Sequence, residues 1–111
     1  MGNTIEERVE LLEELANSEI IKEDYPMIEK IDIKLIKSRH RADSVILMYY
    51  IFLNDSSINV KNMYEKGLDP HYFIDFRMER YYKYFLLNEF TFSTGFKVYD
   101  TDLEVIDAWN V

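Results

Sequence analysis

Hydrophobic residues recur every three or four positions near the start of the chain, and this spacing predicts an amphipathic helix. Its apolar face is made of six residues: Ile5, Val9, Leu11, Leu12, Leu15 and Ala16. The positions between them are nearly all Glu, so the outer face of this helix is acidic. Thr4 and Glu7 have the spacing of a capping box, in which the two side chains satisfy backbone donors at a helix start. We expect the helix to end near residues 17–18, and a short helical piece to lead to a turn at residues 24–26.

Two patterns in the next part of the chain predict a β-hairpin. Residues 30–35 alternate apolar and charged side chains, which is typical of a strand with one buried face. Residues 45–53 are a continuous β-branched and aromatic run, which suits a strand buried on both faces. With a polar link between them, we expect a hairpin of strands 30–37 and 44–53. A buried helix over residues 42–53 has the same periodicity and stays an alternative.

The middle of the chain predicts a short helix. Ser56 or Ser57 can cap a helix that runs through residues 63–64. Gly67 then fits the position just past the helix end, where only glycine enters the left-handed conformation without strain.

A long aromatic helix is predicted over residues 69–89, with Asp69 as N-cap and Pro70 at the first helical position. Residues 69–92 hold nine of the sixteen Phe and Tyr residues of the chain. On a helical projection the apolar residues cover most of the circumference, with Phe73 and Phe76 on one flank, which indicates burial on more than one side. The rings are therefore expected to fill a core first. A Tyr left at the surface would contact a protein partner.

The C-terminal part has strand composition over residues 90–109, interrupted by Thr94-Gly95, which is a hairpin candidate. The chain is too short for two cores, so residues 1–111 are expected to form one domain. We predict an α+β fold, in which an antiparallel sheet of the hairpin and the C-terminal strands is packed by the acidic helix and the aromatic helix.

Charge is distributed unevenly along the chain, whose net charge is -8. Residues 1–29 hold nine acidic residues and only two basic ones, whereas residues 34–41 carry four positive charges and no acid. A domain this acidic repels nucleic acid and anionic membranes as a whole and favours basic partners.

Several function classes are excluded. The chain has no Cys, which rules out disulfides, thiolate catalysis and Cys-ligated metals and is compatible with a reducing compartment. The start lacks the features of a secretion signal, so a cytoplasmic location is expected. The longest apolar run, residues 45–53, is shorter than the roughly 20 residues that a membrane-spanning helix needs. The sequence contains no Walker loop, dinucleotide fingerprint or nucleophile elbow, and we predict no cofactor.

One set of residues has the spacing of a metal or acid–base site. His71, Asp75 and Glu79 fall on one helix face at intervals of four residues. Any solvated helix face produces this spacing, so we favour a solvent-exposed role and predict no metal site. A small metal-dependent enzyme is the least favoured function.

The basic segment offers an alternative binding site. Lys37, Arg39, His40 and Arg41 lie at the expected hairpin tip and can hold a phosphate group. A small nucleic-acid-binding or phosphate-ligand-binding protein is therefore the alternative function.

The favoured function is a small, acidic, non-enzymatic interaction protein. We expect an inhibitor, antagonist or immunity-type protein that binds a basic surface of a larger protein, such as a nuclease or other nucleic-acid-binding protein. A homodimer through the aromatic surface is a further alternative. The partner-binding residues predicted from charge and aromatic character are Glu6, Glu7, Glu10, Glu13, Glu14, Tyr72 and Tyr82.

Overall fold

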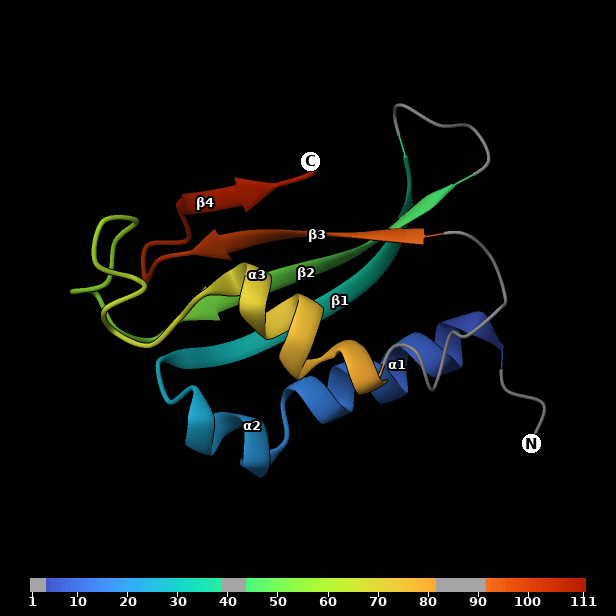
Figure 1. The fold of residues 1–111 in the computed structure, drawn as a ribbon, viewed down its shortest axis with the longest axis horizontal. Helices are drawn as coiled ribbons and strands as arrows, with labels where there is room; N and C mark the ends of the chain where they lie inside the picture. Colours follow the sequence, from blue (N-terminus) through green and yellow to red (C-terminus); the bar gives the residue numbers. More distant parts are fainter. Residues whose placement is uncertain (1–3, 39–43, 82–91) are drawn as a thin grey trace.

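Helices cover one face of a four-stranded sheet in the computed structural model, which describes residues 4–38, 44–81 and 92–111 (Figure 1). In chain order the elements are α1 (Ile5–Ala16), α2 (Glu19–Asp24), β1 (Ile28–Lys37), β2 (Val45–Leu53), α3 (Pro70–Tyr72), the π-helical turn η1 (Phe73–Arg77), β3 (Phe92–Tyr99) and β4 (Val105–Trp109). The strands lie side by side in the order β1-β2-β3-β4. The predicted α+β fold class is confirmed.

The predicted hairpin is present, because β1 and β2 pair antiparallel with Ile36 opposite Ile46. The helical alternative is therefore wrong for Val45–Leu53. Ile31 and Ile33 of β1 point into the core, while Leu47 and Tyr49 of β2 are also fully buried there.

A wholly antiparallel sheet is not what forms, because β2 and β3 run parallel, with Val45 beside Phe92. The chain between these strands carries α3 and η1 across the sheet and returns to the end where β2 begins, as a parallel connection requires. β3 and β4 then pair antiparallel, and both lie within the predicted strand region 90–109. The sheet is mixed, with two antiparallel pairs and one parallel pair.

Gly95 does not form a hairpin turn, because β3 runs through it without a break. A Cβ atom at this position would lie 2.9 Å from the backbone oxygen of Trp109 and 2.9 Å from Cε of Met48. Glycine is needed here because the chain that follows β4 passes closely over β3.

α1 begins and ends where the sequence predicts. The backbone N–H of Glu7 donates to Oγ1 of Thr4 at 3.2 Å, so Thr4 is the N-cap. Asn17 follows the last helical residue, and α2 supplies the expected short helical piece. Val9 and Leu12 bury the inner face of α1 in the core.

α1 also covers the outer edge of β1, where backbone groups would otherwise have no strand partner. The side chain of Asn17 bonds to both backbone groups of Ile31, and Oε2 of Glu13 accepts from the backbone N–H of Ile33 at 2.7 Å. Three hydrogen bonds thus occupy this edge of the sheet.

The short helix predicted to start at Ser56 or Ser57 is wrong, because residues 60–67 form consecutive turns. Oδ1 of Asp55 accepts from both the backbone N–H of Ser57 at 2.9 Å and its hydroxyl at 2.6 Å. Ser57 therefore closes a turn instead of capping a helix. Asn59 stands at the start of the consecutive turns, where its Oδ1 accepts from the backbone N–H of Asn62 at 3.1 Å.

Gly67 behaves as predicted, with a left-handed φ of 98°. The N–H of Leu68 donates to the carbonyl of Met63, and the N–H of Gly67 donates to that of Tyr64, both at 3.0 Å. This pair of bonds is the Schellman arrangement, and the buried side chains of Leu68 and Met63 accompany it.

The start of the aromatic helix is confirmed, because the N–H of Tyr72 donates to Oδ1 of Asp69 at 3.2 Å and Pro70 occupies the first turn. The helix then widens, and the N–H of Met78 donates to the carbonyl of Phe73, five residues back, at 2.9 Å. Residues 79–81 are helical again, and the rest of the predicted helix, residues 82–89, lies outside the described residues.

Candidate functional site

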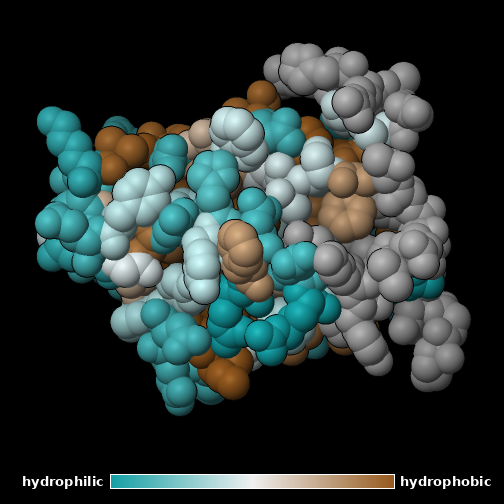
Figure 2. Space-filling model, in the orientation of Figure 1, coloured by the Kyte–Doolittle hydropathy of each residue, from teal (hydrophilic) through white to brown (hydrophobic). Residues whose placement is uncertain are grey.

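Two aromatic rings stand together on the helical face of the domain. The rings of Tyr72 and Phe76 stack with centroids 5.1 Å apart, and their side chains are 55% and 65% exposed. Figure 2 shows this face, which is mostly hydrophilic with a few hydrophobic side chains between the polar ones. We call Tyr72 and Phe76 the aromatic patch. Tyr72 was predicted as a partner-binding residue, and Phe76 was not.

The π-helical turn explains why the sequence missed Phe76. A regular helix would place Phe73 and Phe76 on the same flank, but the wider turn between them separates the two side chains. Phe73 is fully buried and its ring meets Tyr25 edge to face at 4.8 Å, whereas Phe76 points outward. No local signal in the sequence marks this change of pitch.

The aromatic patch lies beside charged groups from α2 and from the start of α3. Arg77 anchors η1 to α2 through its Nη2 atom, 3.3 Å from Oδ2 of Asp24. Partial burial acts to lower the pKa of Arg77, but its interactions with Tyr81 and Asp24 outweigh burial and leave the pKa raised. Asp24 therefore neutralises a fixed positive charge on the packed side of η1.

Tyr25 is the buried residue beneath this region. Burial raises the pKa of its phenol; Arg77 opposes the shift, and Asp24, Tyr72 and Asp69 add to it. Two carboxylates lie near Tyr25 and Tyr72: Asp24 is paired with Arg77, and Asp69 accepts from the backbone N–H of Tyr72. The aromatic patch is thus flanked by the helix-capping carboxylate of Asp69 and by the Asp24–Arg77 ion pair.

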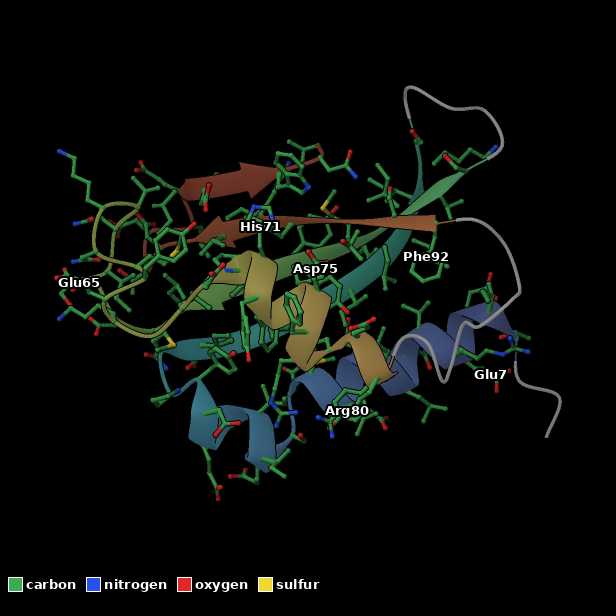
Figure 3. All side chains as sticks on the ribbon, in the orientation of Figure 1. Glu7, Glu65, His71, Asp75, Arg80 and Phe92 are labelled. Atoms are coloured by element: carbon green, nitrogen blue, oxygen red, sulfur yellow. The ribbon has the colours of Figure 1, made fainter. Side chains whose placement is uncertain are left out.

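The acidic residues of α1 have two different roles. Glu6, Glu7, Glu10 and Glu14 are exposed, as a partner-binding role requires. Glu7 stands near the start of the helix (Figure 3). Glu13 is half-buried and is engaged by Ile33 at the sheet edge, so the structure gives it an intramolecular role. Tyr82, also predicted to bind a partner, lies outside the described residues.

A shallow groove of about 360 Å³ runs between α1 and β1. Glu6 and Glu10 border it, and its floor is apolar, with Ile5 and Val9 among the lining residues. Lys34 of β1 lines the opposite side, so the groove is bordered by both signs of charge.

His71 and Asp75 both contact strands of the sheet. The His71 ring lies edge to face against Phe96 at 5.0 Å and against Trp109 at 5.2 Å. Oδ1 of Asp75 accepts from the hydroxyl of Thr94 at 3.2 Å, and both labelled side chains lie over the sheet in Figure 3. Across the described ranges, no group of three or more His, Cys, Asp or Glu could hold a metal ion.

The opposite face of the sheet carries lysines and aromatic rings. Nζ of Lys30 lies 4.9 Å from the centroid of the Phe52 ring, and Phe52 in turn stacks on Tyr99 at 4.7 Å. Nζ of Lys34 lies 6.0 Å from the centroid of the Tyr50 ring. None of the described helices covers this face (Figure 1). The domain therefore has an acidic helical face and a lysine-bearing sheet face.

The predicted anion site at the hairpin tip is described only at Lys37, which is exposed at the end of β1. Arg39, His40 and Arg41 lie outside the described residues. The nucleic-acid-binding or phosphate-binding alternative stays a prediction, which a gel shift at low salt with Arg39→Ala and Arg41→Ala tests.

Comparison of the chain with protein-family models, curated proteins and solved structures found no match. Within the described parts of the chain, no helix is long and apolar enough to span a membrane. A function for this chain therefore has to be argued from its own residues.

Proposed function

We infer that the protein is a non-enzymatic interaction domain that binds a basic surface of a larger protein, as an inhibitor, antagonist or immunity-type protein does. The observation that carries this proposal is the aromatic patch, a stacked Tyr72–Phe76 pair that is more than half exposed. Binding energy at protein interfaces concentrates on a few aromatic anchors surrounded by polar residues. The aromatic patch, with the Asp69 carboxylate and the Asp24–Arg77 ion pair beside it, has this composition.

The backbone under the aromatic patch is held in place before any partner arrives. Asp69 caps the helix, Arg77 ties η1 to Asp24, and Phe73 is buried beneath. A fixed backbone loses little conformational entropy on binding, so more of the contact energy remains as affinity. Single exposed apolar residues are common on protein surfaces, but a stacked pair on an anchored turn is a better binding element.

Charge supplies the specificity for a basic partner. Exposed Glu6, Glu7, Glu10 and Glu14 of α1 lie on the helical side of the domain, and the net charge of the chain is -8. Such a surface attracts a basic protein over a distance of about 10 Å at moderate salt, and added salt screens the attraction. Association should therefore slow as the salt concentration rises.

The test is affinity capture from the native cells with the wild-type protein and the double variant Tyr72→Ala/Phe76→Ala. The matched control is Tyr64→Ala, because Tyr64 is 57% exposed in the turn region before Gly67. We expect a basic protein to be captured by wild type and control but not by the double variant, with at least tenfold weaker binding once the partner is purified. Equal capture by all three proteins, or an affinity that does not change with salt, would contradict the proposal.

A charge-reversal variant separates electrostatic steering by the acidic helix from anchoring by the aromatic patch. Glu6→Lys/Glu10→Lys should slow association with the same partner and reduce its salt dependence, while the dissociation rate changes little. Loss of the aromatic patch should instead speed dissociation. If both variants changed only the dissociation rate, the acidic surface would have no steering role.

A further inference from the structure

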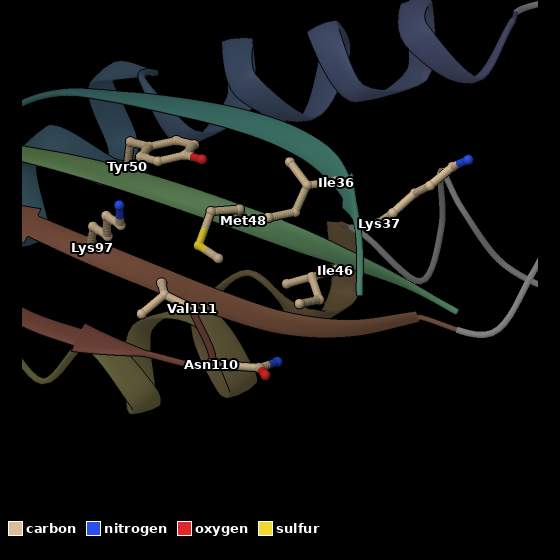
Figure 4. Close-up of a pocket in the computed structure, with 8 residues that line it drawn as sticks. All are labelled: Ile36, Lys37, Ile46, Met48, Tyr50, Lys97, Asn110 and Val111. Carbon is tan, nitrogen blue, oxygen red and sulfur yellow. The ribbon is translucent and has the colours of Figure 1, made fainter. Parts of the chain in front are cut away.

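The face of the sheet that no described helix covers contains a cavity of about 200 Å³ (Figure 4). Its floor is apolar, with Ile46 and Met48 from β2, and both side chains are almost fully buried although no described helix lies above them. Ile36 and Val111 complete the apolar lining. The cavity is separate from the aromatic patch, which lies on the other side of the sheet.

The residues that follow β4 build one wall of this cavity. Asn110 adopts a left-handed φ of 57°, and its Nδ2 atom donates to the carbonyl of Thr94 at 2.9 Å and to Oγ of Ser93 at 3.2 Å. Gly95 permits this approach, because a Cβ there would lie 3.1 Å from the backbone oxygen of Asn110. The wall is therefore fixed to β3 by side-chain and backbone contacts.

An ammonium and a phenol stand together at one end of the cavity. Lys97 and Tyr50 occupy this end, and Ile36 and Ile46 the other, as Figure 4 shows. Lys37 lies at the second end, beside Ile36. Among the described lining residues there is no Asp or Glu, although the chain as a whole is strongly acidic. An ammonium and a phenol beside an apolar floor complement an anion with a hydrophobic body.

The geometry points to a binding site for a small carboxylic acid with a short apolar chain, of about the size of hexanoate. The carboxylate pairs with Nζ of Lys97 and accepts from the hydroxyl of Tyr50, while the alkyl chain lies over Ile46 and Met48. Pockets for drug-sized ligands measure roughly 300–1,000 Å³, so this cavity suits a smaller molecule. Each further methylene that fits should tighten binding about fourfold.

The test is a titration of the full chain with butanoate and hexanoate, followed by backbone amide chemical shifts. We expect saturable shifts in β2 and β3 around Met48 and Lys97, with tighter binding of hexanoate and none of hexylamine. Lys97→Met should weaken hexanoate at least tenfold. Lys30→Met is the control, because Lys30 lies on the same sheet face outside the cavity. Far-ultraviolet circular dichroism checks that both variants fold.

Three results would overturn the assignment: no saturable shift with hexanoate, equal loss in the Lys30 and Lys97 variants, or equal binding of hexylamine. A single-stranded oligonucleotide that binds this face through Lys97 when hexanoate does not would make it a nucleic-acid surface and also end the proposal. Tyr72→Ala/Phe76→Ala should bind hexanoate as wild type does. Failure of the carboxylate site is thus distinguishable from failure of the proposed function.

Discussion

The side-chain amide of Asn17 bonds to both backbone groups of Ile31. Its Nδ2 atom donates to the carbonyl of Ile31 at 2.8 Å, and its Oδ1 atom accepts from the Ile31 N–H at 2.9 Å. The same Nδ2 donates to the carbonyl of Glu13 at 2.8 Å, so one side chain closes α1 and occupies the edge of β1. An open sheet edge can pair with the strands of other chains. At the β1 edge, α1 prevents such pairing.

Asn17→Ala should destabilise the domain by about 1–3 kcal/mol, because part-buried backbone groups of Ile31 lose their partners. Urea unfolding monitored by circular dichroism measures the change. Glu14→Ala is the control, since Glu14 is exposed on the same helix and should change stability little. An Asn17 variant as stable as the control would show that water replaces the amide without cost.

Gly67→Ala should cost about 1–2 kcal/mol, because a non-glycine residue is strained at a φ of 98°. Space is not the cause, since an added Cβ would make only an ordinary contact with Cε of Met27 at 3.6 Å. Gly67→Asn should recover part of the loss, because Asn tolerates the left-handed region better than Ala. Thermal unfolding of the wild type and the two variants measures the difference. Equal melting temperatures would show that the backbone at residue 67 is not strained by a side chain.

Gly95→Ala should destabilise the domain by about 1–3 kcal/mol. Here the cause is lack of space and not backbone strain. Its Cβ would stand 2.9 Å from the backbone oxygen of Trp109, which cannot move without displacing the chain after β4. Amide shifts of Asn110 should change in this variant if the contact with β3 is loosened. A variant with unchanged stability and unchanged Asn110 shifts would mean that the chain accommodates the methyl group.

The features that sequence predicted well are those in which cause and effect lie within a few residues. Thr4, Asp69 and Gly67 act on backbone groups in the same turn, so their roles follow from residue type and position alone. The alternation of residues 30–35 likewise reports which side of β1 is buried. Local signals of this kind can be read from the sequence without knowledge of the fold.

The features that sequence missed depend on distant partners. In the sequence Gly95 looks like a turn residue, because nothing near it shows that the backbone of Trp109 lies close to it. The parallel pairing of β2 with β3 depends on where the crossover returns. The exposure of Phe76 depends on a change of helical pitch that the residues next to it in the sequence do not predict. The candidate sites share this property, since the cavity brings β1, β2 and β3 together with the residues after β4.

Stability should fall at alkaline pH more steeply in the wild type than in Tyr25→Phe. Burial raises the pKa of Tyr25 in the folded state above its unfolded value of about 10. The stabilisation is therefore complete below the unfolded pKa and is lost as the pH rises through the folded pKa. Urea unfolding at several pH values above neutrality measures this, and parallel pH profiles for the two proteins would contradict it.

Asp55 should titrate below its ordinary range, because the hydroxyl and the backbone N–H of Ser57 both donate to its carboxylate and lower its pKa. Its contribution to stability is present above the unfolded pKa and is lost as the pH falls through the lower folded pKa. Ser57→Ala should raise the pKa of Asp55, while Ser56→Ala should leave it unchanged. Carboxyl carbon shifts followed over acidic pH give both values, and an unchanged pKa in Ser57→Ala would refute the role of the hydroxyl.

The parallel pairing of β2 with β3 also orders the events of folding. The β1–β2 hairpin closes over a short link, whereas β3 reaches β2 only after the long crossover of residues 54–91 has been brought back, which costs more chain entropy and time. We expect pulsed hydrogen exchange to show protection at Ile33 before Phe96. A nascent or partly folded chain would then expose the unpaired edge of β2 until β3 arrives, and this interval is when aggregation is most to be expected.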